Sequence, residues 1–404
     1  MPFSAQLEAL PLDGYDLLET TLVITPDIAE QSIAARQTTV LRAESALREL
    51  RFDANALRVA TATLDGEPIA LRVEQRALVL TLPRGVQAGE NATLQFEYSG
   101  TPARGLTFEP NGVYSSYFSC DWMLCALDRP GDKFVLNVDV AAPAHWRTFV
   151  SDSLREYPAY AHGFGAGAWI ETRDQVGDTE LVLLSAQASA PELRSMFAET
   201  SKMLNFFREA AGVPFPHATY TQLLVQGSAA QEGAGFAILG ADIVRPVLTE
   251  PREDWAIAHE LAHQYWGNLV TCADWSHFWL NEGLTTFMVA AWKQRRWGEE
   301  AYAREIATAT TRWAGARDAG WDRPLAFSED YPDLRTRRAV QYSKGMLFFV
   351  ELRRLLGDEP FWRAIRAYTR RHSGGAVVSM DLQRAFEAES GQDLDAVFAA
   401  WVYE

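Results

Sequence analysis

The pentapeptide His259-Glu260-Leu261-Ala262-His263 decides how the rest of the chain can be interpreted. On an α-helix, residues four apart lie on one face with their Cβ atoms about 5–6 Å apart. Two imidazoles at that spacing can bind one small cation, and the intervening glutamate can hold and deprotonate a water molecule. A hydrolytic zinc site also needs a third protein ligand and an open fourth position.

Glu282 supplies the third candidate ligand, in the stretch Trp279-Leu280-Asn281-Glu282-Gly283 at the start of a second helical pattern. A bare pentapeptide of this kind also occurs by chance, and a histidine pair on a helix is often a capped or core pair. The helical context and Glu282 favour the metal site. We therefore expect one zinc ion per chain on His259, His263 and Glu282, with Glu260 as the general base.

The longer stretches 259–268 (HELAHQYWGN) and 279–283 (WLNEG) resemble the gluzincin aminopeptidases of the M1 family. The resemblance covers nearly the whole chain and includes the Cys125–Pro130 turn. It implies a multi-domain α+β fold, with an N-terminal antiparallel β-saddle domain followed by a thermolysin-like, mostly α catalytic domain. Many members continue into a helical domain that roofs the active site. This sequence ends at Glu404, so we expect either a more open cleft or a homodimer that shields it.

The family's Tyr-x-Lys-Gly motif is matched by Tyr342-Ser343-Lys344-Gly345. Attack on an amide creates an oxyanion, which needs a hydrogen-bond donor. The match implies that the phenol of Tyr342 is this donor, although spacing alone would make Tyr342 a core aromatic residue. Lys344 is expected to be a structural partner.

Family exopeptidases use a Gly-Ala-Met-Glu-Asn strand, whose glutamate pairs with the substrate's α-ammonium. The nearest match, Ala229-Ala230-Gln231-Glu232-Gly233, keeps only the Ala and the Glu. A rival register, residues 233–237, would put Phe236 at the carboxylate position. Because a buried cation needs a paired charge, we expect Glu232 to bind the substrate, with an exposed loop carboxylate as the alternative. No residue of 114–121 matches the family's second amine-binding group, and His277 is expected outside the metal's ligands.

Residues 1–188 show β-type alternation, and residues 189–404 show mainly helical patterns, which predicts two domains with these boundaries. Alternation is clearest in residues 78–82, 93–98 and 134–139, and turn signals occur at Asp65-Gly66, Arg84-Gly85 and 110–112. The second part opens with a capping signal at Ser189 and a helical face that continues to Gly212. Further helices are predicted over 279–297, before Gly357, after Pro360 and from 379 to 401.

The composition of the chain limits the classes of partner and the cellular location that we expect. The formal net charge of −16 disfavours nucleic acid and anionic membranes. No apolar run is long enough to span a membrane, and residues 1–8 show no secretory signal. Three cysteines cannot form a disulfide framework, so we expect buried free thiols and a cytoplasmic location.

These observations predict a zinc-dependent aminopeptidase that acts on peptides. Two alternatives stay open. The altered motif around Glu232 is compatible with a zinc endopeptidase or another zinc hydrolase that needs no free N-terminus. A non-catalytic protein that keeps only the fold, for binding or as a scaffold, is the alternative of another class. Such a protein would be expected to lose ligands or the base, and all of them are retained here.

Overall fold

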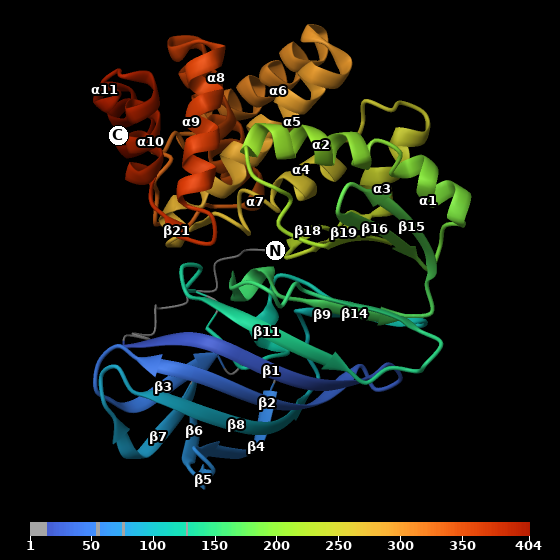
Figure 1. The fold of residues 1–404 in the computed structure, drawn as a ribbon, viewed down its shortest axis with the longest axis vertical. Helices are drawn as coiled ribbons and strands as arrows, with labels where there is room; N and C mark the ends of the chain where they lie inside the picture. Colours follow the sequence, from blue (N-terminus) through green and yellow to red (C-terminus); the bar gives the residue numbers. More distant parts are fainter. Residues whose placement is uncertain (1–13, 54–56, 75–76, 127) are drawn as a thin grey trace.

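The computed structural model describes residues 14–53, 57–74, 77–126 and 128–404. The stretch 1–8, in which no secretory signal is expected, lies outside the described residues, as does Leu127 of the 125–130 turn. A β-rich unit is formed by the first part of the chain and a mainly helical unit by the second, stacked one on the other (Figure 1). The predicted order, an antiparallel β domain followed by a mostly α domain, is confirmed.

A seven-stranded sheet dominates the first unit, in the order β13-β11-β1-β2-β8-β4-β5. Its neighbours pair antiparallel except β1 with β11. In β8, every second residue from Ala92 to Tyr98 is buried, as the alternation predicted. The strands are β1 (Tyr15–Asp27), β2 (Ser32–Ala43), β4 (Leu57–Leu64), β5 (Glu67–Pro68), β8 (Asn91–Gly100), β11 (Lys133–Val140) and β13 (Tyr157–Pro158).

A three-stranded sheet, β3-β7-β6, packs in the same core; its strands are β3 (Leu47–Asp53), β6 (Ala70–Glu74) and β7 (Ala77–Val86). The prediction of a turn at Arg84-Gly85 is wrong, because both residues belong to β7. The pairing of β3 with β7 shifts register between Leu47 and Glu49, so the chain is bulged here and does not reverse. The other two turn signals are confirmed: Asp65 and Gly66 have positive φ, and residues 110–111 join β9 (Leu106–Glu109) to β10 (Gly112–Ser115).

Two further sheets form the junction between the units. One has the order β12-β14-β10-β9, with β12 at Arg147–Val150 and β14 at Phe164–Gly167. The other has the order β15-β16-β17-β19-β18, from β15 (Ile170–Val176), β16 (Thr179–Ser185), β17 (Thr219–Val225), β18 (Ala230–Gly233) and β19 (Phe236–Gly240). Phe149 of the first sheet packs on Phe236 of the second. The second sheet takes strands from both sides of residue 188. A boundary at residue 188 would divide this sheet, so in place of that prediction we propose a boundary before Ile170.

Helices cover the other face of the five-stranded sheet, above it in Figure 1. Ser189 caps the first with the predicted capping box to Glu192. The single helix expected up to Gly212 is interrupted at 197–199, where Glu199 turns to pair with Arg296 and Lys202. The helices are α1 (Ala190–Met196), α2 (Thr200–Ala211), α3 (Ala241–Val244), α4 (Trp255–Ala262), α5 (Trp279–Trp297), α6 (Glu299–Asp318), α7 (Leu334–Arg337), the π-helical η5 (Arg338–Lys344), α8 (Gly345–Leu356), α9 (Asp358–Arg371), α10 (Ser379–Ser390) and α11 (Asp395–Phe398).

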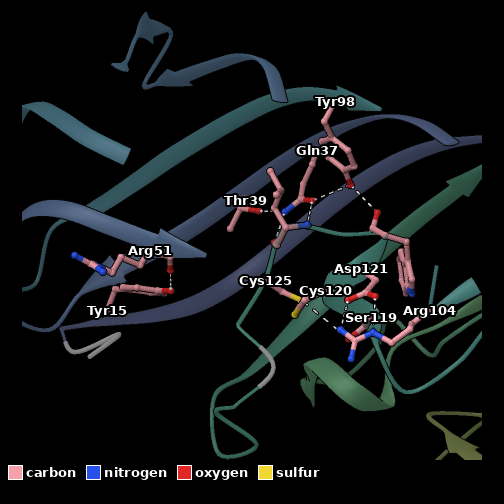
Figure 2. The surroundings of a disulfide bond; sticks show 12 residues. Tyr15, Gln37, Thr39, Arg51, Tyr98, Arg104, Ser119, Cys120, Asp121 and Cys125 are labelled. Atoms are coloured by element: carbon pink, nitrogen blue, oxygen red, sulfur yellow. Dashed lines mark hydrogen bonds and ion pairs between the residues drawn. A yellow bond between two sulfur atoms is a disulfide. The ribbon is translucent and has the colours of Figure 1, made fainter. Parts of the chain in front are cut away.

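The cysteines correct one expectation. Cys120 and Cys125 form a buried disulfide (Figure 2), and only Cys272 is a free, buried thiol. The 3-10 turn η1 (Ser119–Asp121) brings the two Cα atoms within 5.1 Å, a separation that a disulfide can bridge. An odd number of cysteines therefore does not prevent two of them from forming a bond when they lie close together in the sequence. Among the described residues, no helix combines the length and the apolarity that crossing a membrane requires.

Candidate functional site

Helices α4 and α5 bring the three predicted metal ligands together. The Nε2 atoms of His259 and His263 lie 3.1 Å apart. Oε2 of Glu282, in the first turn of α5, lies 3.2 Å from the first nitrogen and 3.4 Å from the second. All three side chains are buried.

The donor set fits a tetrahedral zinc ion. Ligand atoms about 2.0–2.2 Å from such an ion lie roughly 3.3–3.6 Å from one another, close to the 3.1–3.4 Å that separates these three atoms. His263 donates its Nδ1 proton to the carbonyl of Trp266 at 2.9 Å, because a carbonyl oxygen can only accept. The Nε2 lone pair of His263 is therefore free for a cation.

A second layer of contacts holds these ligands. The indole of Trp255 stacks on the His259 ring at 4.4 Å between centroids. Asn281, next to Glu282, donates to the Tyr160 hydroxyl at 3.0 Å, and this hydroxyl donates to the Gly267 carbonyl at 2.9 Å. The start of α5 is thereby fixed to the loop that follows α4.

Three carboxylates are concentrated in the site: Glu232, Glu260 and Glu282 are each at most 3% exposed. Burial, followed by the neighbouring Glu232, raises the pKa of Glu260 well above its usual value. Burial also raises the pKa of Glu232. Burial acts in the same direction on Glu282, but the two histidines outweigh it and hold the pKa of Glu282 below its usual range. Within the described parts of the chain, the salt bridges of these three carboxylates are those of Glu282 with the histidines.

Glu232 lies on strand β18, buried, so it is not an exposed loop carboxylate. One of its oxygens lies within 4.8 Å of donor atoms of Glu260 and His263. The rival register would place Phe236 at the position of the amine-binding carboxylate. Phe236 is instead a core residue of β19 that packs on Phe149.

Tyr117 is a site residue that the sequence did not reveal. Its hydroxyl lies 2.7 Å from Oε2 of Glu232 and 2.8 Å from the carbonyl of Ala230. It comes from the 114–121 segment, in which no residue matched the family's pattern, and only the docking of the two units brings it to β18.

Gln264 joins the β18–β19 hairpin to α4. Its Oε1 accepts from the Gly235 N–H at 3.0 Å, and its Nε2 donates to the carbonyls of Gly233 at 3.0 Å and Glu260 at 3.2 Å. The carboxylates of Glu232 and Glu260 are thus carried by two elements that are hydrogen-bonded to each other.

Tyr342 lies in the π-helical segment η5, a conformation that often occurs at functional sites. Its ring stacks 5.7 Å from that of His259. Burial and the charge of Glu282 raise the pKa of Tyr342 well above its usual value, so the phenol keeps its proton and can donate. Lys344 contacts Asp322 and the Arg323 carbonyl instead, at 2.9 and 2.7 Å.

His277 does not join the three metal-ligand candidates. Its Nδ1 lies 2.8 Å from Oγ of Ser379, and the indole N–H of Trp279 donates to the same oxygen at 3.0 Å.

The chain is similar to known proteins in sequence and in fold. The family model "Peptidase family M1 domain" matches residues 196–401. The chain is 29% identical over 223 residues to Aminopeptidase N of Streptomyces lividans, covering 52% of this chain and 26% of that protein. It is 33% identical over 161 residues to Leucine aminopeptidase 2 of Aspergillus oryzae, covering 37% and 25%. The matched regions thus span about a quarter of the length of these relatives.

The crystal structure of an M1 zinc metallopeptidase from Deinococcus radiodurans superimposes with a TM-score of 0.80. The superposition covers 96% of this chain and 94% of that one, at 24% sequence identity, and shows that the two share a fold. Together with the match of the family model over half of the chain, this establishes that the chain belongs to peptidase family M1.

Proposed function

We propose that the protein is a zinc-dependent aminopeptidase that removes N-terminal residues from peptides. The observation that carries this proposal is the charge of the site. Three buried carboxylates face two histidines, and their combined formal charge of −3 would be balanced by a divalent ion and by one substrate ammonium. Buried charges are retained in proteins when they are paired or bind metal.

His259, His263 and Glu282 would hold the ion. A bound Zn²⁺ would supply a nucleophile at neutral pH by lowering the pKa of water from 15.7 to ~7. Glu260 is suited to take up the proton and return it to the leaving amine, because burial raises its pKa well above the usual value of a glutamate. Tyr342 would donate to the oxyanion, and Glu232, held by Tyr117, would pair with the α-ammonium of the substrate.

The buried carboxylate of Glu232, held by the partly buried Tyr117, favours an aminopeptidase over an endopeptidase, which would have no cation to place against this carboxylate. The intact base and ligands favour an enzyme over a scaffold. The aminopeptidase names of the relatives support the same choice. Homodimer formation stays a prediction. The cytoplasmic location also stays one, and the Cys120–Cys125 bond removes the premise of free thiols behind it.

A pair of matched peptides tests the proposal. Peptides of one sequence, with a free or an acetylated N-terminus, are incubated with the zinc-loaded protein and analysed by mass spectrometry. We expect stepwise loss of N-terminal residues from the free peptide only, and about one zinc per chain. Internal cleavage of both peptides would identify an endopeptidase, and no cleavage of either by the zinc-loaded protein would identify a scaffold.

A further inference from the structure

Lys133 is a buried cation that the proposed chemistry does not use. It is the first residue of β11, in the β-rich unit, and is 8% exposed. Its ammonium lies in a cage of four backbone carbonyl oxygens of the helical unit: Asn268 at 3.2 Å, Leu269 at 3.4 Å, Gly374 at 3.2 Å and Gly375 at 3.4 Å. Across the described residues, Lys133 forms no salt bridge.

The cage has the chemistry of a cation site, because carbonyl dipoles that converge on one point repel one another unless a positive charge lies between them. Burial lowers the pKa of Lys133 to about 8, so at neutral pH the group is still mainly an ammonium ion. A neutral side chain of similar length would fill the same volume without the cost of burying a charge. The presence of a lysine at this buried position therefore points to a need for the charge.

Two loops form the cage, and one of them orients a metal ligand. The two loops are hydrogen-bonded to each other: the Gly374 N–H donates to the Leu269 carbonyl at 2.8 Å. The loop that carries Asn268 and Leu269 directly follows α4. Its Trp266 carbonyl accepts the His263 Nδ1 proton, and its Asn268 N–H donates to the His263 carbonyl at 3.0 Å.

We propose that Lys133 is a positioning residue: its ammonium clamps the loop after α4, so that docking of the β-rich unit sets the orientation of His263 and the affinity of the metal site. The clamp works through the carbonyl cage and has no contact with the substrate. This inference rests on the proposed metal site but not on the peptidase reaction, since its main readout is metal affinity.

The test uses the full-length protein with two changes of Lys133. Lys133→Met keeps most of the volume and removes the charge, and Lys133→Ala opens the cage. Zinc affinity is measured by competition with a chelator. Loss of a group that orients a metal ligand typically weakens metal binding 10–100-fold, and we expect a loss of that size for both variants, with kcat reduced at unchanged KM in the zinc-saturated enzyme.

Chemical rescue separates the clamp from ordinary packing. Methylammonium can enter the space left in Lys133→Ala and offer three N–H donors, so it should restore zinc affinity. Tetramethylammonium at the same ionic strength has no N–H group and should not. Lys293→Met is the matched control: Lys293 is also buried, but it pairs with Glu305 at 2.6 Å, away from the cage. Zinc affinity should be unchanged in this control.

Wild-type zinc affinity in Lys133→Met would overturn the proposal. So would a folded Lys133→Ala that methylammonium does not rescue, or a loss in Lys293→Met as large as that in Lys133→Met. If Lys133→Ala does not fold, Lys133→Met decides. An inactive wild-type protein that nevertheless binds zinc would refute the proposed function. The effect of Lys133 on zinc affinity could still be measured in that protein.

Discussion

The two sides of the site are built in different ways. The proposed metal side comes from neighbouring helices, with His259 on α4, His263 at the C-cap of α4 one turn later, and Glu282 at the start of α5. The proposed amine side joins Glu232 of β18 to Tyr117, which is 115 residues away in sequence and belongs to the other unit. Helical spacing therefore suffices to place the histidines, whereas the amine side forms only when the two units dock. A substitution on one side should therefore leave the function of the other side intact, so that the two can be measured separately.

The largest effect is expected on the metal side. Glu260→Gln removes the base but keeps the size of the side chain, so kcat should fall by roughly 10²–10⁴ while about one zinc per chain is retained. Steady-state kinetics and metal analysis of the same sample check this. Exposed Glu253, changed to Gln, is the control. Near-normal turnover of Glu260→Gln would refute the assigned base.

On the amine side, Glu232→Ala should reduce kcat/KM by a factor corresponding to about 2–5 kcal/mol, the cost of leaving one charge of a buried pair alone. The loss should be confined to substrates with a free amine. We would measure the acetylated and free forms of one peptide at saturating zinc. Equal losses on both would mean that Glu232 does not bind the ammonium.

Tyr342→Phe removes one hydroxyl next to the metal side. Loss of an oxyanion donor typically costs 10²–10³ in kcat, and zinc should be retained. Tyr331→Phe is a matched control, because the Tyr331 hydroxyl accepts from Gln341 and does not belong to the site. A rise in KM with kcat unchanged would instead give Tyr342 a role in substrate binding.

Acid should weaken the docked segment of the β-rich unit. His162 is fully buried, with Nε2 3.1 Å from the Phe134 carbonyl, and burial lowers its pKa to about 4. Between this value and the unfolded pKa of about 6.5, the unfolded chain binds the extra proton, so stability rises with pH through this window and is lost on acidification. From pH 7 to pH 5 this contribution should fall by about 2 kcal/mol.

Urea unfolding of the metal-free protein measures this fall. A His162→Gln variant, whose side chain does not titrate, should lack this component of the pH dependence. An unchanged pH dependence in the variant would assign the acid sensitivity to other groups.

The smallest effect concerns Tyr117. Tyr117→Phe keeps the ring and removes the hydrogen bond to Glu232. Because the hydroxyl is shared with the Ala230 carbonyl, kcat/KM for free-amine substrates should fall by about 1.5 kcal/mol, the lower end of the range for a hydrogen bond to a charged group. Zinc affinity should not change. A loss of zinc would show that the two sides are coupled more tightly than their separate origins suggest.

The same contrast explains what the sequence could predict. The closeness of His259 and His263 follows from their spacing on one helix, and strand β8 follows from alternation. Glu282 could be named only as a candidate at the start of a second helix. Tyr117 could not be found, because no local pattern records which loop meets β18 after docking. The turn expected at Arg84-Gly85 failed for a related reason: Gly85 lies in a bulged pairing with β3, and pairing is not visible in a single segment. The Cys120–Cys125 bond depends on a 3-10 turn that no periodicity indicated.

The five-stranded sheet that crosses residue 188 has a consequence for dissecting the protein. β16 pairs in parallel with β17, from Glu180 with Thr219 to Ser185 with Leu224. A fragment that begins at Ser189 would carry β17 with one side of its backbone unpaired and its apolar residues uncovered. Open edges of this kind template pairing between chains. Such a fragment is therefore prone to aggregate, whereas a cut before β15 would keep the sheet whole.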